Sequence, residues 1–287
     1  MKLATFVHEG VERPGVVVGD RIVPTPHASL LALIQAGPSA IAEAGKLAAS
    51  AGTSGGYRLN AVSLRAPIPN PPRNVFCVGR NYKLHIEEGA RARGVAADYP
   101  RMPEFFTKAT HAVCGPGDDI RLPGITQKLD YEVELAFVIG KRGRDIKARD
   151  AGDHILGYMV LNDVTARDLQ RGHGQWFKGK SLDTTCPVGP WIVTSDEFDV
   201  TADHRIWLSV NGEMRQDSLT TDMVFDCAAI LESLSAGLTV EPGDIITTGT
   251  PSGVGLGMDP QVWLRDGDIM EAGIDGIGSI TNTIRAV

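Results

Sequence analysis

The chain has 287 residues, of which 43% are hydrophobic and 22% are charged, and it carries a formal net charge of -7 at pH 7. These values are typical of a globular protein with one main domain and room for a smaller one. The negative charge argues against nucleic acid or an anionic membrane as the main partner, because both attract basic surfaces. An anionic substrate would therefore need a local cation to overcome the field of the whole chain.

The pattern of apolar residues and cysteines indicates a cytoplasmic protein. The first residues contain no apolar run of signal-peptide length, and no later run approaches the roughly 18 residues that a membrane helix needs. The cysteines lie far apart without a C-x-x-C pair, at Cys77, Cys114, Cys186 and Cys227. We therefore expect buried, reduced thiols and no membrane partner.

Residues 1–70 are predicted to form a small α+β N-terminal domain. Two short strand patterns, "KLATFV" and "GVVVGDRIVPT", precede the Ala/Leu-rich helical stretch "SLLALIQAGPSAIAEAGKLAAS". Residues 66–74, "APIPNPPRN", hold four prolines in nine residues. Proline removes backbone donors and fixes φ, so this stretch is expected to connect the first domain to a second one at residues 71–287.

The segment "GRNYKLHIEEGARARG" is predicted to be a short helix followed by a weakly anchored loop. His85 and Glu88 are three residues apart, so on a helix they share a face and can form a hydrogen bond. Gly89 is expected to end the helix after fewer than three turns, and a helix that short is marginal in water. We therefore predict that residues 83–100 form a lid that ligand binding orders.

Strand patterns dominate the rest of the chain: "VFCVG", "YEVELAFVIG", "ILGYMVLNDV", "WIVTSD", "RIWLSVNGEMRQ" and "DIITTGT". Asn211-Gly212 between two of them predicts a type I′ hairpin. One longer helix is predicted in "TDMVFDCAAILESLSAG", with Asp222 in its first turn and Gly237 at its end. The second domain is therefore predicted to be mostly β, or α+β, without the regular alternation of a Rossmann fold.

Glu132 and Glu134 raise the question of a metal site. They share one face of a strand whose remaining residues are apolar, so their carboxylates could approach to roughly 6 Å and repel by about 3 kcal/mol at an effective dielectric near 20. Asp163 ends another apolar strand, and three oxygen donors suit Mg²⁺, Mn²⁺ or Ca²⁺. The alternative is a solvated strand edge, with Asp163 as a helix N-cap. Asp130 and Asp168 compete for the role of metal ligand.

Six segments together resemble the fumarylacetoacetate hydrolase family. They are "VGRNYKLHIEE", "DYEVELAFVIG", "LNDVTARDLQ", "QWFKGKSLDTTCPVGPW", "VNGEMRQDSLTTDMVF" and "VEPGDIITTGTPSGVG", in the family's order across residues 73–285. The resemblance implies a catalytic domain with a mixed β-roll of β-sandwich character, and a homodimer. Glu132, Glu134 and Asp163 would hold one Mg²⁺ or Mn²⁺, as in the shorter three-carboxylate branch of the family that acts on acylpyruvates and related 2-oxo acids.

The resemblance also implies roles for residues around that metal. His85 and Glu88 match the catalytic pair, and Lys180 matches a lysine that faces the substrate. Gln170 matches a polar, substrate-binding position near the metal, and Thr250 matches a position that lines the substrate pocket. Further candidates for substrate binding, named from their residue types, are Arg80, Tyr82 and Lys108.

The leading hypothesis for function is metal-dependent hydrolysis of a carbon–carbon bond in a 2,4-dioxo acid. His85, oriented by Glu88, would activate water, and Lys180 would assist the departure of a pyruvate-type enolate. The alternatives are a decarboxylase, lyase or isomerase of the same family, acting on oxaloacetate, 2-hydroxyhepta-2,4-diene-1,7-dioate or a ureidoglycolate-type substrate. A binding protein that keeps the ion for structure is a third class, which the His85 and Glu88 pair disfavours.

Overall fold

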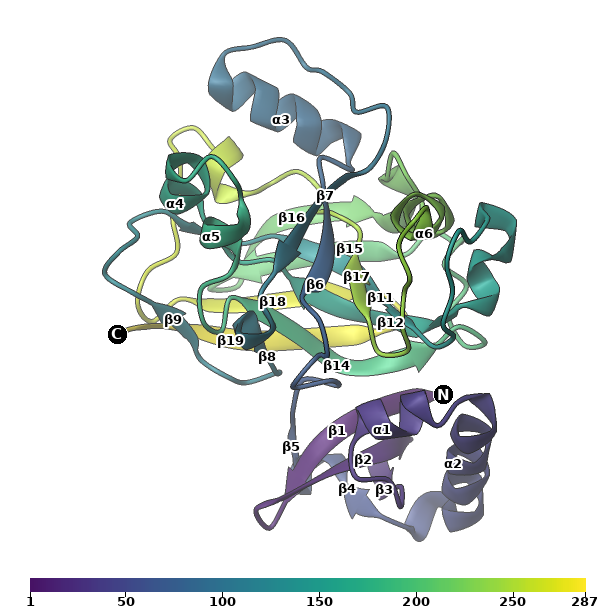
Figure 1. The fold of residues 1–287 in the computed structure, drawn as a ribbon. Helices are drawn as coiled ribbons and strands as arrows, with labels where there is room; N and C mark the ends of the chain where they lie inside the picture. Colours follow the sequence, from purple (N-terminus) through teal and green to yellow (C-terminus); the bar gives the residue numbers. More distant parts are fainter.

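The structure is a computed structural model that describes residues 1–287, apart from the side chain of Thr53. It is mostly β, with 35% of residues in strands and 24% in helices, as the sequence predicts. The main sheet has the strand order β4-β3-β2-β1-β14-β12-β11-β17-β6-β7, and a second sheet has the order β16-β15-β18-β19-β9. The two sheets pack face to face, with β15 and β18 against β11 and β12 (Figure 1).

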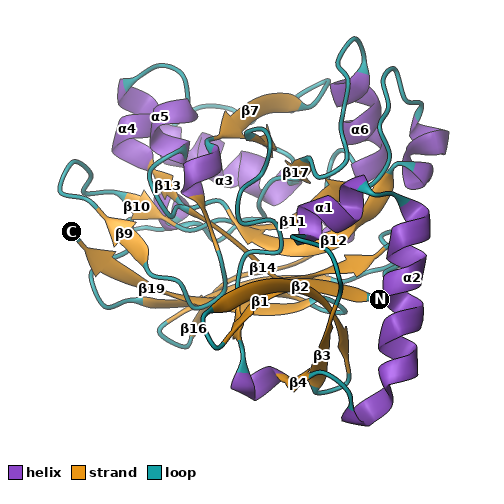
Figure 2. Cartoon of the chain, turned by 60° about the horizontal axis from the view of Figure 1, so that its bottom comes forward, coloured by secondary structure: helices purple, strands orange, loops and turns teal.

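The N-terminal strands extend the main sheet rather than forming a sheet of their own. They lie below the rest of the chain in Figure 1, and α2 flanks them on one side (Figures 1 and 2). β1 pairs with β14 at Lys2↔Val193 and Leu3↔Ile192. The elements are β1 (Lys2–His8), β2 (Val11–Val18), β3 (Arg21–Pro24), α1 (Leu30–Gln35), α2 (Pro38–Ala51), β4 (Tyr57–Arg58) and β5 (Ser63–Leu64). Residues 66–74 contain neither helix nor strand, and a domain boundary near residue 70 stays a prediction.

The remaining strands of the main sheet are β6 (Val75–Gly79), β7 (Glu104–Lys108), β8 (Val113–Cys114), β11 (Val133–Ile139), β12 (Ile155–Asn162), β14 (Cys186–Thr194) and β17 (Ile245–Thr247). The second sheet contains β9 (Ile120–Leu122), β15 (Arg205–Val210), β16 (Glu213–Leu219), β18 (Ile269–Ile274) and β19 (Gly278–Ala286). A short pair, β10 (Leu129–Asp130) with β13 (Thr165–Ala166), lies beside the two sheets. The helices are α3 (Lys83–Arg93), α4 (Arg167–Gly172), α5 (Phe177–Lys180) and α6 (Cys227–Ser235).

Strand β11 is buried on both faces because a core lies on each side of it. Leu135 and Phe137 point into the core between the two sheets, with Leu208. Ala136 and Val138 point into the core that the N-terminal unit covers. A strand covered on both sides needs apolar residues at successive positions, which explains why the face that begins with two glutamates turns apolar.

The structure corrects two expected helix boundaries. The helix that begins at Lys83 does not end at Gly89. It continues to Arg93 and is capped by Gly94, which has φ +68°. The helix predicted from residue 221 begins only at Cys227, where the side chain of Asp226 caps it by accepting the N–H of Ala229 at 2.8 Å. A glycine in a helix costs only about 1 kcal/mol relative to alanine, which the buried face of α3 offsets.

Other local expectations are confirmed. Asn211 and Gly212 have φ of +53° and +79° and join β15 to β16, as a type I′ turn requires. The four cysteines are unpaired and buried. Among the described residues, no helix is both long and apolar enough to cross a bilayer. Cytoplasmic location and homodimer formation stay predictions.

Candidate active site

The pairing of β11 with β12 brings three carboxylates to one end of the main sheet. Glu132 directly precedes β11, Glu134 lies within it, and Asp163 directly follows β12. The two strands are antiparallel with Val133 opposite Asn162, so the start of one lies beside the end of the other. One ligand atom from each carboxylate lies within 4.8 Å of the others, and all three side chains are buried. The expected group of three is therefore confirmed as a set that could hold a metal ion.

The burial of this group excludes the alternative of a solvated strand edge. Glu132, Glu134 and Asp163 are 4%, 1% and 0% exposed. Asp163 is not a helix cap either, because α4 begins at Arg167 and Ala166 occupies its N-cap position.

Two lysines reach into the carboxylate group. Nζ of Lys180 lies 2.5 Å from a carboxylate oxygen of Glu132 and 2.5 Å from one of Asp163. Lys108 donates to the second oxygen of Asp163 at 2.6 Å and to the carbonyl of Val164 at 3.0 Å. Lys108 is fully buried, so the structure places it behind Asp163 rather than where a substrate carboxylate would bind.

The carboxylates differ in how well their charges are compensated. Burial raises the pKa of Glu134 well above its usual range, and the charges of Asp163 and Glu132 add to that effect. Burial acts on Glu132 too, but Arg167 and Lys180 overcome it and hold the pKa of Glu132 far below the ordinary value. Glu134 instead accepts hydrogen bonds from the hydroxyl of Thr247 and from the N–H of Gly249 at 2.9 Å. Glu134 is therefore the carboxylate that most needs a cation.

The charges of the buried cluster fit a divalent metal. Within the described chain, four buried carboxylates are in contact with, or adjacent to, three buried cationic side chains, which leaves one negative charge when all are ionised. A divalent ion would convert this into one net positive charge, which suits an anionic substrate. The donors are all hard carboxylate oxygens, the type that Mg²⁺ and Mn²⁺ prefer. The carboxylates are Asp130, Glu132, Glu134 and Asp163, and the cations are Lys108, Arg167 and Lys180.

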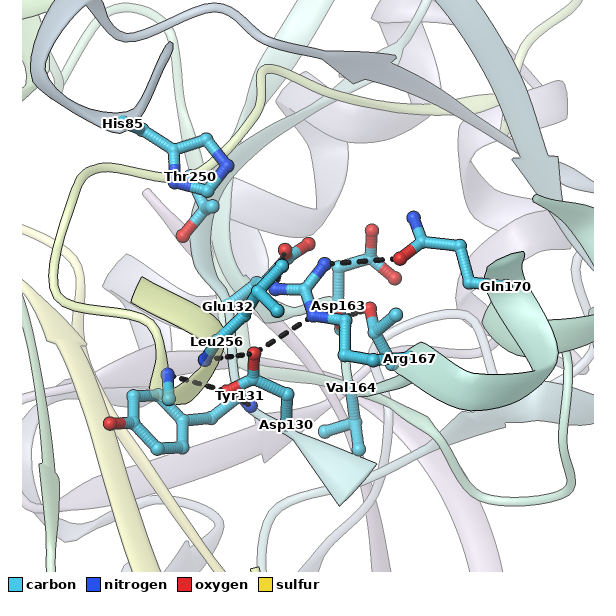
Figure 3. Close-up of polar contacts among 12 residues, drawn as sticks. His85, Asp130, Tyr131, Glu132, Asp163, Val164, Arg167, Gln170, Thr250 and Leu256 are labelled. Atoms are coloured by element: carbon cyan, nitrogen blue, oxygen red, sulfur yellow. Dashed lines mark hydrogen bonds and ion pairs between the residues drawn. The ribbon is translucent and has the colours of Figure 1, made fainter. Parts of the chain in front are cut away.

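Arg167 is a site residue to which the sequence analysis assigned no role. Its guanidinium lies 2.8 Å from a carboxylate oxygen of Asp130 and 2.5 Å from one of Glu132 (Figure 3). Asp130 also accepts the backbone N–H groups of Gly255 at 2.7 Å and Leu256 at 3.1 Å. The pairing of β10 with β13, which places Asp130 opposite Thr165, brings these groups together. Apolar strand patterns do not reveal such a short pair.

The two carboxylates that competed for the metal role have other partners. Asp130 is bound by Arg167 and by the backbone N–H groups of Gly255 and Leu256. Asp168 accepts the hydroxyl of Thr126 at 2.6 Å and the N–H of Gln127 at 2.9 Å, and so fastens a loop. Neither belongs to the metal-binding group found among the described residues.

The expected pair of His85 and Glu88 forms on α3. Nδ1 of His85 lies 3.2 Å from one carboxylate oxygen of Glu88, and the other oxygen accepts the N–H of Gly253 at 2.9 Å. A carboxylate at Nδ1 favours the tautomer with the proton on that nitrogen, which leaves Nε2 free to accept a proton. Figure 3 shows the His85 ring on the same side of the site as Thr250.

A cavity of about 410 Å³ joins these groups. Of the predicted site residues, its wall includes Arg80, His85, Glu132, Glu134, Gln170, Lys180 and Thr250. Arg80 is also paired with Glu104 at 2.8 Å. Tyr82 is 1% exposed and borders a separate hollow of about 300 Å³ on the other side of α3, so the structure does not place it in the cavity wall. The cavity has a proton acceptor, His85, on one side, and the group of buried carboxylates with Lys180 on the other.

Comparisons with known proteins identify the family to which the chain belongs. Residues 74–285 match the family described as "Fumarylacetoacetate (FAA) hydrolase C-terminal". An oxaloacetate tautomerase of Bacillus subtilis is 48% identical over 79% of this chain and 75% of its own length. A mitochondrial oxaloacetate tautomerase of Xenopus laevis is 43% identical over 78% of this chain and 68% of its own length.

Solved structures of similar proteins cover the chain from end to end. A fumarylacetoacetate hydrolase from Exiguobacterium antarcticum is 42% identical with a TM-score of 0.82, and the match covers 100% of both chains. A 2-hydroxyhepta-2,4-diene-1,7-dioate isomerase from Mycobacterium marinum is 34% identical with a TM-score of 0.77, over 100% of this chain and 98% of its own. The names of these relatives include tautomerases and an isomerase as well as a hydrolase.

Proposed function

Because the chain belongs to the fumarylacetoacetate hydrolase family, we propose that it is a divalent-metal-dependent isomerase that interconverts the keto and enol forms of a 2-oxo acid of the oxaloacetate class. The observation that carries the proposal is the placement of His85, Lys180 and the carboxylate group around one cavity. Keto–enol exchange needs a proton acceptor near the carbon next to the carbonyl and positive charge near the carbonyl oxygen. This cavity supplies both.

The residues divide the reaction between them. Nε2 of His85 takes a proton from C3 of the keto form, and the Glu88 carboxylate at Nδ1 stabilises the imidazolium that results. The ammonium of Lys180 faces the oxygen that becomes negative. That oxygen takes a proton from water to give the enol, and the imidazolium of His85 returns its proton to water. A bound Mg²⁺ or Mn²⁺ would act as a Lewis acid that stabilises the charge developing on the 2-oxo group. The C=O double bond becomes a C=C double bond, and no σ bond between carbon and another heavy atom is made or broken.

The names of the relatives support isomerisation over the hydrolysis that the sequence analysis placed first. Hydrolysis of a 2,4-dioxo acid is the second candidate. Two observations favour it. The same His85–Glu88 pair is placed as a base that can activate a water molecule, and one similar solved structure is of a fumarylacetoacetate hydrolase.

One set of assays separates the candidates. Mg²⁺-loaded protein is given enol oxaloacetate, and the loss of enol absorbance and the exchange of deuterium into C3 are followed. In parallel, pyruvate release is measured from oxaloacetate and from acetylpyruvate. We expect faster tautomer exchange without pyruvate release, and loss of this activity in His85→Ala but not in His111→Ala, which changes an exposed histidine outside the cavity. Pyruvate release from acetylpyruvate without accelerated exchange would replace the proposal with hydrolysis.

A further inference from the structure

Two arginines at the cavity wall have no role in the site described so far. Arg93 is the last residue of α3, the helix that carries His85, and Arg171 lies in α4, the helix that carries Gln170. Both line the cavity, and both are exposed. α3 and α4 lie on the same side of the molecule in both views (Figures 1 and 2). The two guanidinium groups therefore reach the cavity from separate helices.

These arginines differ from the other cations in the cavity wall by having no carboxylate partner. Arg80 pairs with Glu104 at 2.8 Å, and Arg167 and Lys180 pair with buried carboxylates at 2.5–2.8 Å. Within the described part of the chain, neither Arg93 nor Arg171 forms a salt bridge. Arg93 donates through Nε to the carbonyl of Gly89, which leaves its terminal nitrogens unused. In a chain with a net charge of -7, two uncompensated cations at one cavity are a local departure from the overall field.

A simpler explanation is that both arginines stabilise helix ends, because cations near a helix C-terminus interact favourably with its dipole. Arg91 fulfils that condition equally well in the last turn of α3, yet it does not line the cavity. Stabilisation of the helix end explains why arginines occur there. It does not explain why Arg93 and Arg171 both line the same cavity.

We propose that Arg93 and Arg171 form a subsite for the second carboxylate of a dicarboxylic 2-oxo acid. The inference rests on the proposed function, in which the 2-oxo acid group lies at the carboxylate and Lys180 end of the cavity. The other end of a dicarboxylate then extends toward the two arginines, whose planar guanidinium groups match a carboxylate. A monocarboxylic acylpyruvate offers them no charge. The site is thus selective for diacids.

The test compares two substrates that differ only in the second charge, oxaloacetate and its C4 methyl ester. Values of kcat/KM for keto–enol exchange are measured for the wild type, Arg93→Ala, Arg171→Ala and the double variant. For each arginine removed, we expect the value for the diacid to fall roughly 10- to 100-fold and the value for the ester to change less than about twofold. Arg91→Ala is the matched control, because it removes one charge from the same helix end without altering the cavity wall. It should leave both values unchanged.

A binding measurement keeps this inference separable from the proposed function. Dissociation constants for both compounds are measured by calorimetry with Mg²⁺ in the His85→Ala background, where turnover is not needed. Weaker diacid binding in the arginine variants, with unchanged ester binding, supports the subsite. This holds even when the wild type catalyses no exchange, because absence of exchange refutes only the proposed isomerase activity. Equal losses for diacid and ester, or no loss for the diacid, would overturn the subsite whatever the activity.

Discussion

One carboxylate oxygen of Glu88 accepts the backbone N–H of Gly253 at 2.9 Å, while its other oxygen lies 3.2 Å from Nδ1 of His85. Glu88 therefore connects the helix that carries the proposed base to the loop that follows β17. Gly253 has φ +104°, a backbone conformation that glycine adopts easily and other residues rarely adopt. A glycine at this position therefore allows the loop to point its N–H toward Glu88. The orientation of the imidazole depends on a loop some 165 residues away in the sequence.

Replacement of Glu88 by glutamine should slow catalysis more than it weakens binding. Glutamine keeps the size of the side chain but removes the charge that stabilises the imidazolium. We expect kcat to fall by roughly 10- to 100-fold with a small change in KM. Steady-state kinetics with oxaloacetate measures this. Glu87→Gln is the matched control, because Glu87 is an exposed neighbour that bonds to Tyr99, and a loss of kcat there of equal size would contradict the assignment.

Gly257 offers a second, independent way to disturb the same pair. A Cβ atom at this position would lie 2.1 Å from Cδ of Glu88, far inside contact distance. Gly257→Ala should therefore push Glu88 away from His85 and lower kcat as the glutamine variant does. Gly124→Ala, at a site with open space, should have no effect. Full activity in Gly257→Ala would show that the position of Glu88 does not matter for catalysis.

Metal binding should stabilise the fold and depend on Glu134. Any ligand that binds only the folded state adds about 2.7 kcal/mol of stability when present at 100 times its dissociation constant. We expect Mg²⁺ or Mn²⁺ to raise Tm and EDTA to reverse the rise and abolish activity. Glu134→Gln should lose the metal-dependent rise. Asp168→Asn removes a neighbouring carboxylate that fastens a loop, and it should keep the full metal response. A Tm that metal and chelator both leave unchanged would argue against the site.

The buried pair of Asp130 and Arg167 should matter far more for stability than an exposed pair. Asp130 is 0% exposed, and burial raises its pKa despite the opposing charge of Arg167. Removing one member of a buried pair costs about 3–5 kcal/mol, so Asp130→Asn should lower the free energy of unfolding by an amount in that range. Asp217→Asn breaks the exposed pair with Arg205 and should cost about 0–1 kcal/mol. Chemical denaturation measures both, and equal costs would refute the distinction.

The cysteines should be unreactive in the folded protein. Burial raises the pKa of Cys77, Cys114 and Cys227, and that of Cys186 to about 12, so little thiolate is present near neutral pH. Thiol reagents attack the thiolate, and these side chains are covered. Labelling with an aromatic disulfide reagent at pH 8 should be negligible in the native state and give four equivalents after unfolding in denaturant. Rapid labelling of the native protein would contradict the packing around them.

Much of the site can be predicted from patterns that are local in the sequence. A strand places Glu132 and Glu134 on the same face of a sheet. A helix places His85 and Glu88, which are three residues apart, on the same face of the helix. Asn211-Gly212 specifies its turn without help from the rest of the chain. These relationships depend on local backbone geometry alone. The resemblance to a known family favoured the metal site over a solvated strand edge and supplied the role of Lys180.

Only the tertiary structure decided what those groups contact. The link from Asp130 to Arg167, the burial of Lys108 behind Asp163 and the N–H of Gly253 beside Glu88 all join segments that are far apart in the chain. The tertiary structure also decided the length of α3, because packing of its buried face stabilises the helix beyond Gly89. Contacts of this kind depend on strand register and on the free energy of burial summed over many residues. A short-range pattern contains neither, so the sequence indicates which side chains could do chemistry, and the packed fold determines which of them share a cavity.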